Sequence, residues 1–253
     1  MKAVSTILDD ASRVLKIAFR NEGDVILLLD GSNSFVGAQH AAPLLGNQPT
    51  TGHSERSEES AFSLVRAVRE FSSSEYSKTI AGIVAGEPPA IDLADEKRLQ
   101  DCLVALAAAG AVQSAHDISD GGLAVTLAES CFASAGNQPN ACHPESPRSS
   151  RGEGSAFYSL GAIANLRDDS LPAEFAAFNE RGARAIVSVT PSKLAHVLNT
   201  ARQYNVAAEE LGQVTRDGSF RIEHKGRAVI DSSVESLRDA WAHSLERTLA
   251  ANQ

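Results

Sequence analysis

The chain has 253 residues, of which 43% are hydrophobic and 22% charged, a composition typical of a globular protein long enough to bury a substantial core. The formal net charge of −9 and the isoelectric point near 5.3 argue against nucleic acid and anionic membranes as partners, because both reward clustered Lys and Arg. No apolar run approaches the roughly 20 residues that span a bilayer, and the first ten residues lack the apolar core of a signal peptide. Three cysteines without metal-type spacing argue against a disulfide framework, so the sequence predicts a cytoplasmic protein with reduced thiols.

The first half of the chain predicts two strands and two helices. An apolar run at 25–29 (VILLL) indicates a buried strand that ends in a turn. Asp92 can cap a helix that continues to Ala109, because apolar residues recur along one face and Gly110 can end it. The residues expected on that face are Leu99, Leu103, Leu106 and Ala107. The remaining elements are a strand at 112–116 and a helix at 122–132.

The second half predicts a strand at 184–189, followed by a helix at 193–204 that Thr190 or Ser192 caps. Two further strands, at 211–214 and 220–223, are expected to pair around a turn at 216–218. The last strand and the terminal helix are predicted at 228–231 and 233–249. The helix is expected to turn one side inward, with Val234, Leu237, Trp241, Leu245 and Leu249. Irregular alternation of strands and helices, with antiparallel hairpins, favours an α+β layered domain over a doubly wound one.

Two polar stretches, at about 46–71 and 136–158, interrupt this pattern. Both begin with Gly-Asn-Gln-Pro and neither shows the periodicity of a core-forming element. They resemble translated mobile repeat elements, and compact domains rarely contain structureless loops of this length. We therefore interpret them as insertions in a single domain that spans residues 1–253. A functional lid is the alternative interpretation.

Residues 116–124 (HDISDGGLA) carry the densest group of reactive side chains, where a predicted strand ends and a predicted helix begins. Free N–H groups at a helix start can hold an anion, and the carboxylates of Asp117 and Asp120 can hold Mg²⁺ through oxygen. The segment therefore predicts a phosphate–metal site. The alternative is purely structural, with Asp120 as a helix cap, the two glycines as a tight turn, and His116 as a packing residue.

Residues 116–130 (HDISDGGLAVTLAES) resemble a signature in the C-terminal domain of formylglycinamide ribonucleotide amidotransferases, which are also called phosphoribosylformylglycinamidine synthases. These proteins are related to aminoimidazole ribonucleotide synthetase. Further segments resemble the same domain in the same order: 23–28, 74–78 (SEYSK), 86–93 (GEPPAIDL), 178–184 (FNERGAR), 211–215 and 237–241. The resemblance covers nearly the whole chain outside the two polar stretches. One departure is that Ser72 and Ser73 stand where the family usually has glycines.

The resemblance implies the last domain in the second half of the ligase subunit, with an α/β/α layered fold and a mostly antiparallel mixed sheet. The family uses ATP and Mg²⁺ to activate the formyl amide oxygen of formylglycinamide ribonucleotide, and ammonia from a glutaminase then displaces the phosphate to give the amidine. By position, Asp117 corresponds to a metal ligand and Glu180 to a residue on the substrate side. The candidates for binding nucleotide or phosphate are Ser119, Asp120, Gly121 and Gly122. No catalytic residue is assigned, because the catalytic histidine belongs to domains outside the matching part.

The resemblance leaves several hypotheses open, and whether the chain acts as an enzyme is among them. The chain is either a split subunit that completes the ligase or a non-catalytic remnant of a broken gene. As a split subunit it would pack against the missing N-terminal synthetase domains and work with a glutaminase subunit. A structural module that binds nucleotide or supports assembly is a further alternative. We expect no catalysis by the chain alone, and an uncovered sheet edge or apolar face predicts self-association.

Overall fold

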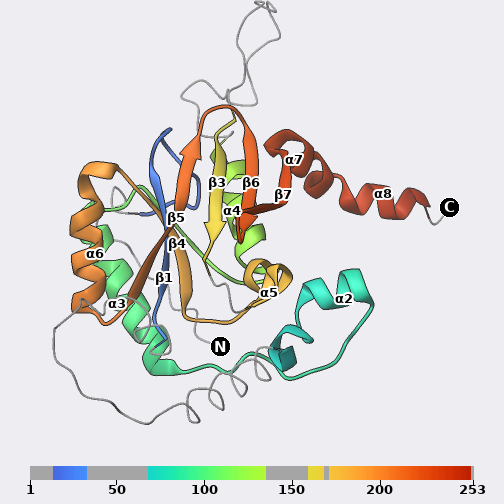
Figure 1. Cartoon of the computed structure of the whole chain (residues 1–253), viewed down its shortest axis with the longest axis horizontal. Helices are drawn as coiled ribbons and strands as arrows, with labels where there is room; N and C mark the ends of the chain where they lie inside the picture. Colours follow the sequence, from blue (N-terminus) through green and yellow to red (C-terminus); the bar gives the residue numbers. More distant parts are fainter. Residues whose placement is uncertain (1–13, 33–67, 135–158, 168–170, 252–253) are drawn as a thin grey trace, which may run out of the picture.

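The computed structural model describes residues 14–32, 68–134, 159–167 and 171–251. In these residues a seven-stranded sheet has the order β2-β4-β1-β5-β3-β6-β7, and helices lie on both of its faces (Figure 1). Neighbouring strands are antiparallel except β3 and β6, which are parallel. The predicted α+β class with a mostly antiparallel mixed sheet is therefore confirmed.

The boundaries of the elements are as follows. The strands are β1 (Val25–Asp30), β2 (Ser114–Asp117), β3 (Gly161–Leu166), β4 (Arg184–Val189), β5 (Ala207–Thr215), β6 (Ser219–His224) and β7 (Arg227–Ser233). The helices are α2 (Glu75–Ala81), α3 (Leu93–Ala108), α4 (Gly122–Ser134), α5 (Ala173–Phe178), α6 (Leu194–Gln203), α7 (Val234–Ala242) and α8 (Ser244–Ala251).

Strand β1 divides the interior into two cores, because successive side chains of a strand point to opposite faces of the sheet. Ile26 and Leu28 belong to the core that α4, α5 and α7 cover. Leu27 and Leu29 belong to the core that α3 and α6 cover. A strand buried on both faces must be apolar at almost every position, which is why the VILLL run has no alternation. The α/β/α layering follows from these two cores.

Helix α3 forms as the sequence predicts. The Asp92 side chain accepts hydrogen bonds from the N–H groups of Ala94 and Asp95, at 2.7 and 3.3 Å, and so caps the helix. Leu99 and Leu106 are buried on the inner face. The cap predicted for α6 is wrong, because neither Thr190, before the first turn, nor Lys193, at the N-cap of α6, makes a side-chain capping hydrogen bond. A 3₁₀ turn over Pro191–Lys193 precedes α6 instead.

The predicted pairing between the strands at 211–214 and 220–223 is wrong. Strand β3 lies between β5 and β6, antiparallel to the first and parallel to the second. The turn at 216–218 does form, and Asp217 Oδ1 accepts hydrogen bonds from Ser219 and Thr215 that lower the pKa of Asp217 to about 2. A tight turn fixes only the local chain direction, so β5 and β6 can diverge far enough to admit a third strand.

The inward face predicted for the terminal helix is correct only for its first turns. Val234 is buried and Leu237 packs against the core. Trp241 is 60% exposed, and its ring still contacts Phe132 on α4 at a centroid distance of 5.9 Å. Beyond it Leu245 and Leu249 are 69% and 58% exposed. The helix is interrupted at His243, and α8 projects away from the sheet (Figure 1). The apolar side of α7 and α8 therefore extends beyond the part of the domain that covers it.

Several sequence features lie partly or wholly outside the described ranges. They include Cys142, the stretch at 136–158, and most of the stretch at 46–71. Residues 68–71, at the end of the first stretch, are helical, and Phe71 is buried. Cys102 and Cys131 are free, and burial raises their pKa to about 11 and about 12. In the part of the chain that the structure covers, no helix combines the length and apolarity needed to cross a membrane.

The two-sided core around β1 makes a testable prediction. Leu27→Ala should lower the free energy of unfolding by about 2–5 kcal/mol, because Leu27 is fully buried and its loss leaves a cavity. Leu245→Ala, on the exposed side of α8, should change it by no more than about 0.5 kcal/mol. Urea unfolding of both variants checks this, and equal losses would contradict the assignment of β1 to the centre of the core.

Candidate functional site

The segment at 116–122 lies at an edge of the sheet and leads from β2 into α4. His116 and Asp117 are the last two residues of β2, which pairs only with β4 among the described strands. His116 Nε2 lies 3.0 Å from Glu129 Oε2 on α4, so the ring links the strand to the helix. The Asp117 side chain is 79% exposed, and Ser119 and Asp120 are exposed as well.

Two glycines shape the turn that follows. Gly121 and Gly122 have φ values of 79° and 65°, in the left-handed region that favours glycine. A Cβ atom on Gly122 would lie 2.6 Å from the carbonyl carbon of Phe178, so the start of α4 approaches the end of α5 more closely than any side chain would allow. The Gly122 N–H donates to the Ser119 carbonyl at 3.0 Å and closes the turn.

Glu180 joins three segments that the sequence analysis singled out. Its Oε1 atom accepts a hydrogen bond from the Gly121 N–H at 2.8 Å and another from the Glu75 N–H at 2.9 Å. Glu75 is the first residue of α2, which Ser74 caps by accepting from the Ser77 N–H. The N–H of Gly121, a candidate phosphate donor, thus binds a carboxylate of the same chain in this structure.

Stacked aromatic rings join α5 to α2 and to Phe71, which precedes α2. Phe71 stacks on Phe175 with ring centroids 4.1 Å apart, and Tyr76 stacks on Phe178 at 4.5 Å. Phe71 and Tyr76 are themselves 5.6 Å apart. Tyr76 therefore has a structural role, and the rings hold α2 where its first N–H reaches Glu180.

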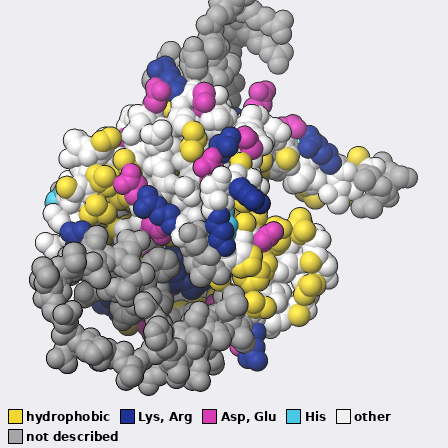
Figure 2. All heavy atoms as spheres, viewed as in Figure 1, with side chains coloured by type: hydrophobic (Ala, Val, Ile, Leu, Met, Phe, Trp, Pro, Cys, Tyr) yellow, Lys and Arg dark blue, Asp and Glu magenta, His cyan; other side chains and the backbone are white. Residues whose placement is uncertain are grey.

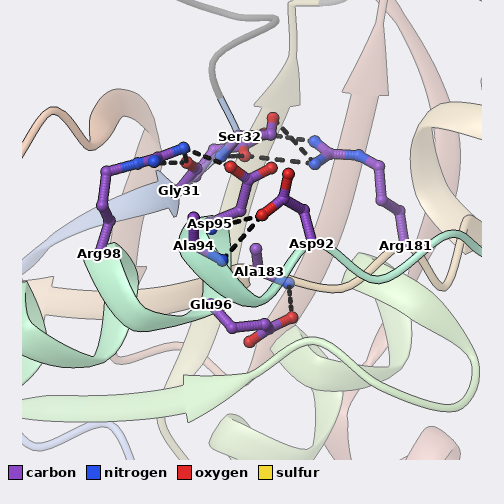
Figure 3. Close-up of polar contacts among 10 residues, drawn as sticks. Gly31, Ser32, Asp92, Ala94, Asp95, Glu96, Arg98, Arg181 and Ala183 are labelled. Carbon is purple, nitrogen blue, oxygen red and sulfur yellow. Dashed lines mark hydrogen bonds and ion pairs between the residues drawn. The ribbon is translucent and has the colours of Figure 1, made fainter.

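A polar cluster at the end of β1, around Asp30, was not predicted from the sequence. Figure 3 shows Arg181 and Arg98 approaching this point from opposite sides. The Arg181 guanidinium pairs with the Asp30 carboxylate and donates to the Ser32 hydroxyl at 3.0 Å. Asp30 is nearly buried, with a side chain 3% exposed, so this ion pair is largely shielded from water.

The other side of this cluster involves the first turns of α3. Arg98 donates to the Gly31 carbonyl at 3.0 Å and pairs with Asp95 (Figure 3). Glu96 accepts from the Ala183 N–H at 2.6 Å. The FNERGAR segment at 178–184 supplies Arg181 and Ala183 to this cluster. From that segment only Glu180 was predicted from the sequence to be a site residue.

Arg184 completes the ordering of this segment from within the sheet. Its guanidinium is buried and donates to the carbonyls of Asn179 and Arg181, at 2.6 and 3.1 Å. Burial, with repulsion from Arg181, lowers the pKa of Arg184 to about 9. A buried guanidinium that bonds two backbone carbonyls fixes the path of the chain between α5 and β4.

Asp117, the candidate metal ligand, has no cluster of metal-binding side chains around it among the described residues. Among the described residues no group of three His, Cys, Asp or Glu side chains is arranged to hold a metal ion. Mg²⁺ often binds one or two carboxylates and takes its other oxygens from phosphate and water. The exposed Asp117 carboxylate fits a single contact of that kind, and it does not form part of a protein cage.

The fold and this turn define a domain of the synthetases related to aminoimidazole ribonucleotide synthetase. Residues 21–225 match the family described as AIR synthase related protein, C-terminal domain, and the chain belongs to that family. The resemblance inferred from residues 116–130 is thereby confirmed.

The curated relatives are subunits of phosphoribosylformylglycinamidine synthase. The chain is 34% identical over 244 residues to the subunit PurL of Moorella thermoacetica, and the match covers 96% of this chain and 25% of that protein. It is 28% identical over 246 residues to the subunit PurL of Thermoanaerobacter sp. (strain X514), covering 97% of this chain and 25% of the relative. The chain thus spans about a quarter of the length of these relatives.

Solved structures of the same enzyme share the fold. Thermotoga maritima PurL complexed with FGAR superimposes with a TM-score of 0.57 at 17% identity, over 90% of this chain and 30% of that one. The same protein complexed with ATP gives 0.53 at 16% identity, over 90% and 27%. Identity at this level supports the fold and carries no residue roles.

The Glu180 contacts generate a prediction. Glu180→Ala should lower the free energy of unfolding by about 1–2 kcal/mol, because two backbone N–H groups lose their acceptor. Hydrogen exchange should quicken at the amides of Glu75 and Gly121. Glu174→Ala, at an exposed position on α5, is the matched control and should change neither quantity. Unchanged exchange at both amides in Glu180→Ala would rule out the bridge.

Proposed function

We propose that this chain supplies one domain of a phosphoribosylformylglycinamidine synthase, the ATP-dependent ligase that forms the amidine of formylglycinamide ribonucleotide in purine biosynthesis, and that it is inactive alone. The observation that carries this proposal is the match between 96–97% of the chain and one quarter of the synthase subunits. A domain of this size accounts for part of such a ligase and leaves the rest to other domains. We place the assembly in the cytoplasm.

The residues of this chain would act by binding and positioning. ATP, when bound, supplies the phosphoryl group that activates the amide oxygen, and Asp117 would contact its Mg²⁺ through an exposed carboxylate. Ser119, Asp120, Gly121 and Gly122 form the turn beside that carboxylate and would border the nucleotide phosphates. Glu180 would hold this turn against α2, on the substrate side of the domain.

The proposed partners are the N-terminal synthetase domains and a glutaminase subunit. A structure of PurLQS from Thermotoga maritima resembles this chain with a TM-score of 0.53. Uncovered apolar side chains suit a domain that packs against others. Figure 2 shows such side chains gathered around α2. Ile80 on α2 and Ile83 and Val84 just after it are 67%, 48% and 84% exposed. The same surface would drive self-association when the partners are missing.

A structural module without catalytic or nucleotide contacts is the second candidate. The bond from the Gly121 N–H to Glu180 favours it, because a donor already bound to a carboxylate is not free for phosphate. A remnant of a broken gene would likewise make no catalytic or nucleotide contacts. The two polar stretches, interpreted as insertions, favour the remnant.

The first test is reconstitution. The purified chain, given formylglycinamide ribonucleotide, ATP, Mg²⁺ and ammonia, should form no amidine. Mixed with Moorella thermoacetica PurL that lacks the matching quarter, it should restore turnover. The control is the matching quarter of the Moorella protein, supplied in place of this chain. Turnover by the chain alone would contradict its inactivity, and restoration by the Moorella quarter but not by this chain would favour the remnant.

The second test is calorimetric titration with Mg²⁺–ADP. If the turn at 119–122 borders a nucleotide, the chain should bind with micromolar affinity, and Asp117→Ala should weaken binding at least tenfold. Asp101→Ala is the matched control, since Asp101 is an exposed aspartate on α3 that pairs with Lys97. The absence of any heat of binding would leave the structural module as the better description.

A further inference from the structure

The end of the terminal helix has an apolar side that the domain does not bury. Residues 238–250 are all exposed. Among them Trp241, Leu245 and Leu249 recur every four residues, so they share one side of α7 and α8. Helices shorter than about 12 residues are marginal in water unless packing supports them. Because α8 has eight residues, its apolar side requires a surface that covers it.

Helices α7 and α8 are tied to each other and form one projecting unit. Asp239 on α7 pairs with Arg247 on α8 and with His243 between the two helices. The Arg247 N–H also donates to the His243 carbonyl at 3.0 Å, so the helical path continues across the break. Figure 1 shows this unit extending away from the sheet, and we call residues 238–250 the arm.

A second apolar surface is uncovered on the same side of the molecule. Ile80 near the end of α2, and Ile83 and Val84 just after it, are large exposed side chains. We call these three residues the α2 surface. Figure 1 shows α2 on the side from which the arm projects, and Figure 2 shows apolar side chains gathered around α2.

We propose that two copies of this chain form a two-fold dimer in which the arm of each copy lies on the α2 surface of the other. Copies related by a two-fold axis exchange identical contacts, so such an assembly closes at two. The exchange needs the arm and the α2 surface on one side of the molecule, as they are in Figure 1. A projecting arm also reaches a neighbouring copy without a clash between the two sheets.

The apolar area favours this exchange over the pairing of like surfaces. A standard interface buries about 800 Å² of each partner, and the apolar part of that is roughly 450 Å². Arm against arm brings three large apolar side chains from each copy, on the order of 300 Å², and the same holds for two α2 surfaces. The exchange brings six from each copy, on the order of 600 Å², which is enough for a standard interface.

The charges of the arm argue against a membrane as its covering surface. Interfacial helices that bind anionic lipid carry Lys and Arg on their polar face. Helices α7 and α8 together carry three acidic and two basic residues, so the apolar side suits a protein surface better. The dimer does not rest on the proposed function, because reconstitution of the ligase can fail while the chain still dimerises.

Sedimentation velocity of the full chain at a series of concentrations tests the proposal. We expect a dimer of the 26.7 kDa chain with a micromolar dissociation constant. Ile80→Glu on the α2 surface and Leu245→Glu on the arm should each weaken dimerisation at least tenfold. Val104→Glu, at an exposed apolar position on α3, is the matched control and should leave it within twofold. All three positions are exposed in the single chain, so each variant should keep the wild-type circular dichroism.

An equimolar mixture of Ile80→Glu and Leu245→Glu distinguishes the exchange from other dimers. One intact arm can still meet one intact α2 surface, so the mixed pair should associate at least tenfold more tightly than either variant with itself. Val84→Glu replaces Ile80→Glu if that variant does not fold, because Val84 is the most exposed residue of the α2 surface.

Four results would overturn the proposal. The first is a wild-type chain that stays monomeric at millimolar concentration, which would leave the arm to a different protein. The second is dimerisation that survives either Ile80→Glu or Leu245→Glu, which would indicate that like surfaces pair or that other surfaces are used. The third is a mixture that associates no more tightly than its components, and the fourth is growth beyond the dimer.

Discussion

The nearly buried carboxylate of Asp30 constrains much of this domain. A charge at the end of a central strand is tolerated only if a cation and hydrogen bonds compensate for its lost hydration. Arg181 provides the cation, and the Ser32 N–H donates to Asp30 Oδ1 at 2.8 Å. Because Arg181 must reach β1, the chain between α5 and β4 has little freedom, and Arg184 restricts it further by bonding two of its carbonyls.

The position of Glu180 follows from that constraint. Glu180 precedes Arg181 and contacts the Gly121 turn and the start of α2, whereas Arg181 contacts the end of β1. One short segment therefore links β1, the turn at the start of α4, and α2. A ligand that displaces Glu180 from Gly121 would act on all three elements, because the neighbouring ion pair with Asp30 keeps the segment from moving independently.

Sequence reasoning succeeded where a residue's environment is set by its neighbours along the chain. The VILLL run could only be a strand buried on both faces, and Asp92 followed by an amphipathic pattern could only begin a helix. It failed where pairing is nonlocal: nothing near the turn at 216–218 indicates that Gly161–Leu166 enters between the flanking strands. The apolar residues of the terminal helix, up to Leu249, do follow a helical period. Periodicity does not indicate whether the surface that would cover them belongs to the same chain. The Glu180 bridge could not be predicted because its donors are backbone N–H groups, which every residue but proline carries.

The order of the strands has a consequence for how the chain folds during synthesis. Val25 of β1 pairs with Val189 of β4 and with Gln213 of β5, so both neighbours of the central strand are made long after it. The one tight hairpin between paired strands is β6–β7, near the other end of the described chain. Long-range pairing requires loop closure before it gives any stabilisation, and such sheets form slowly. Strand β1 therefore leaves the ribosome with both backbone edges unpaired, and those edges stay open to aggregation until residues 184–213 have been translated.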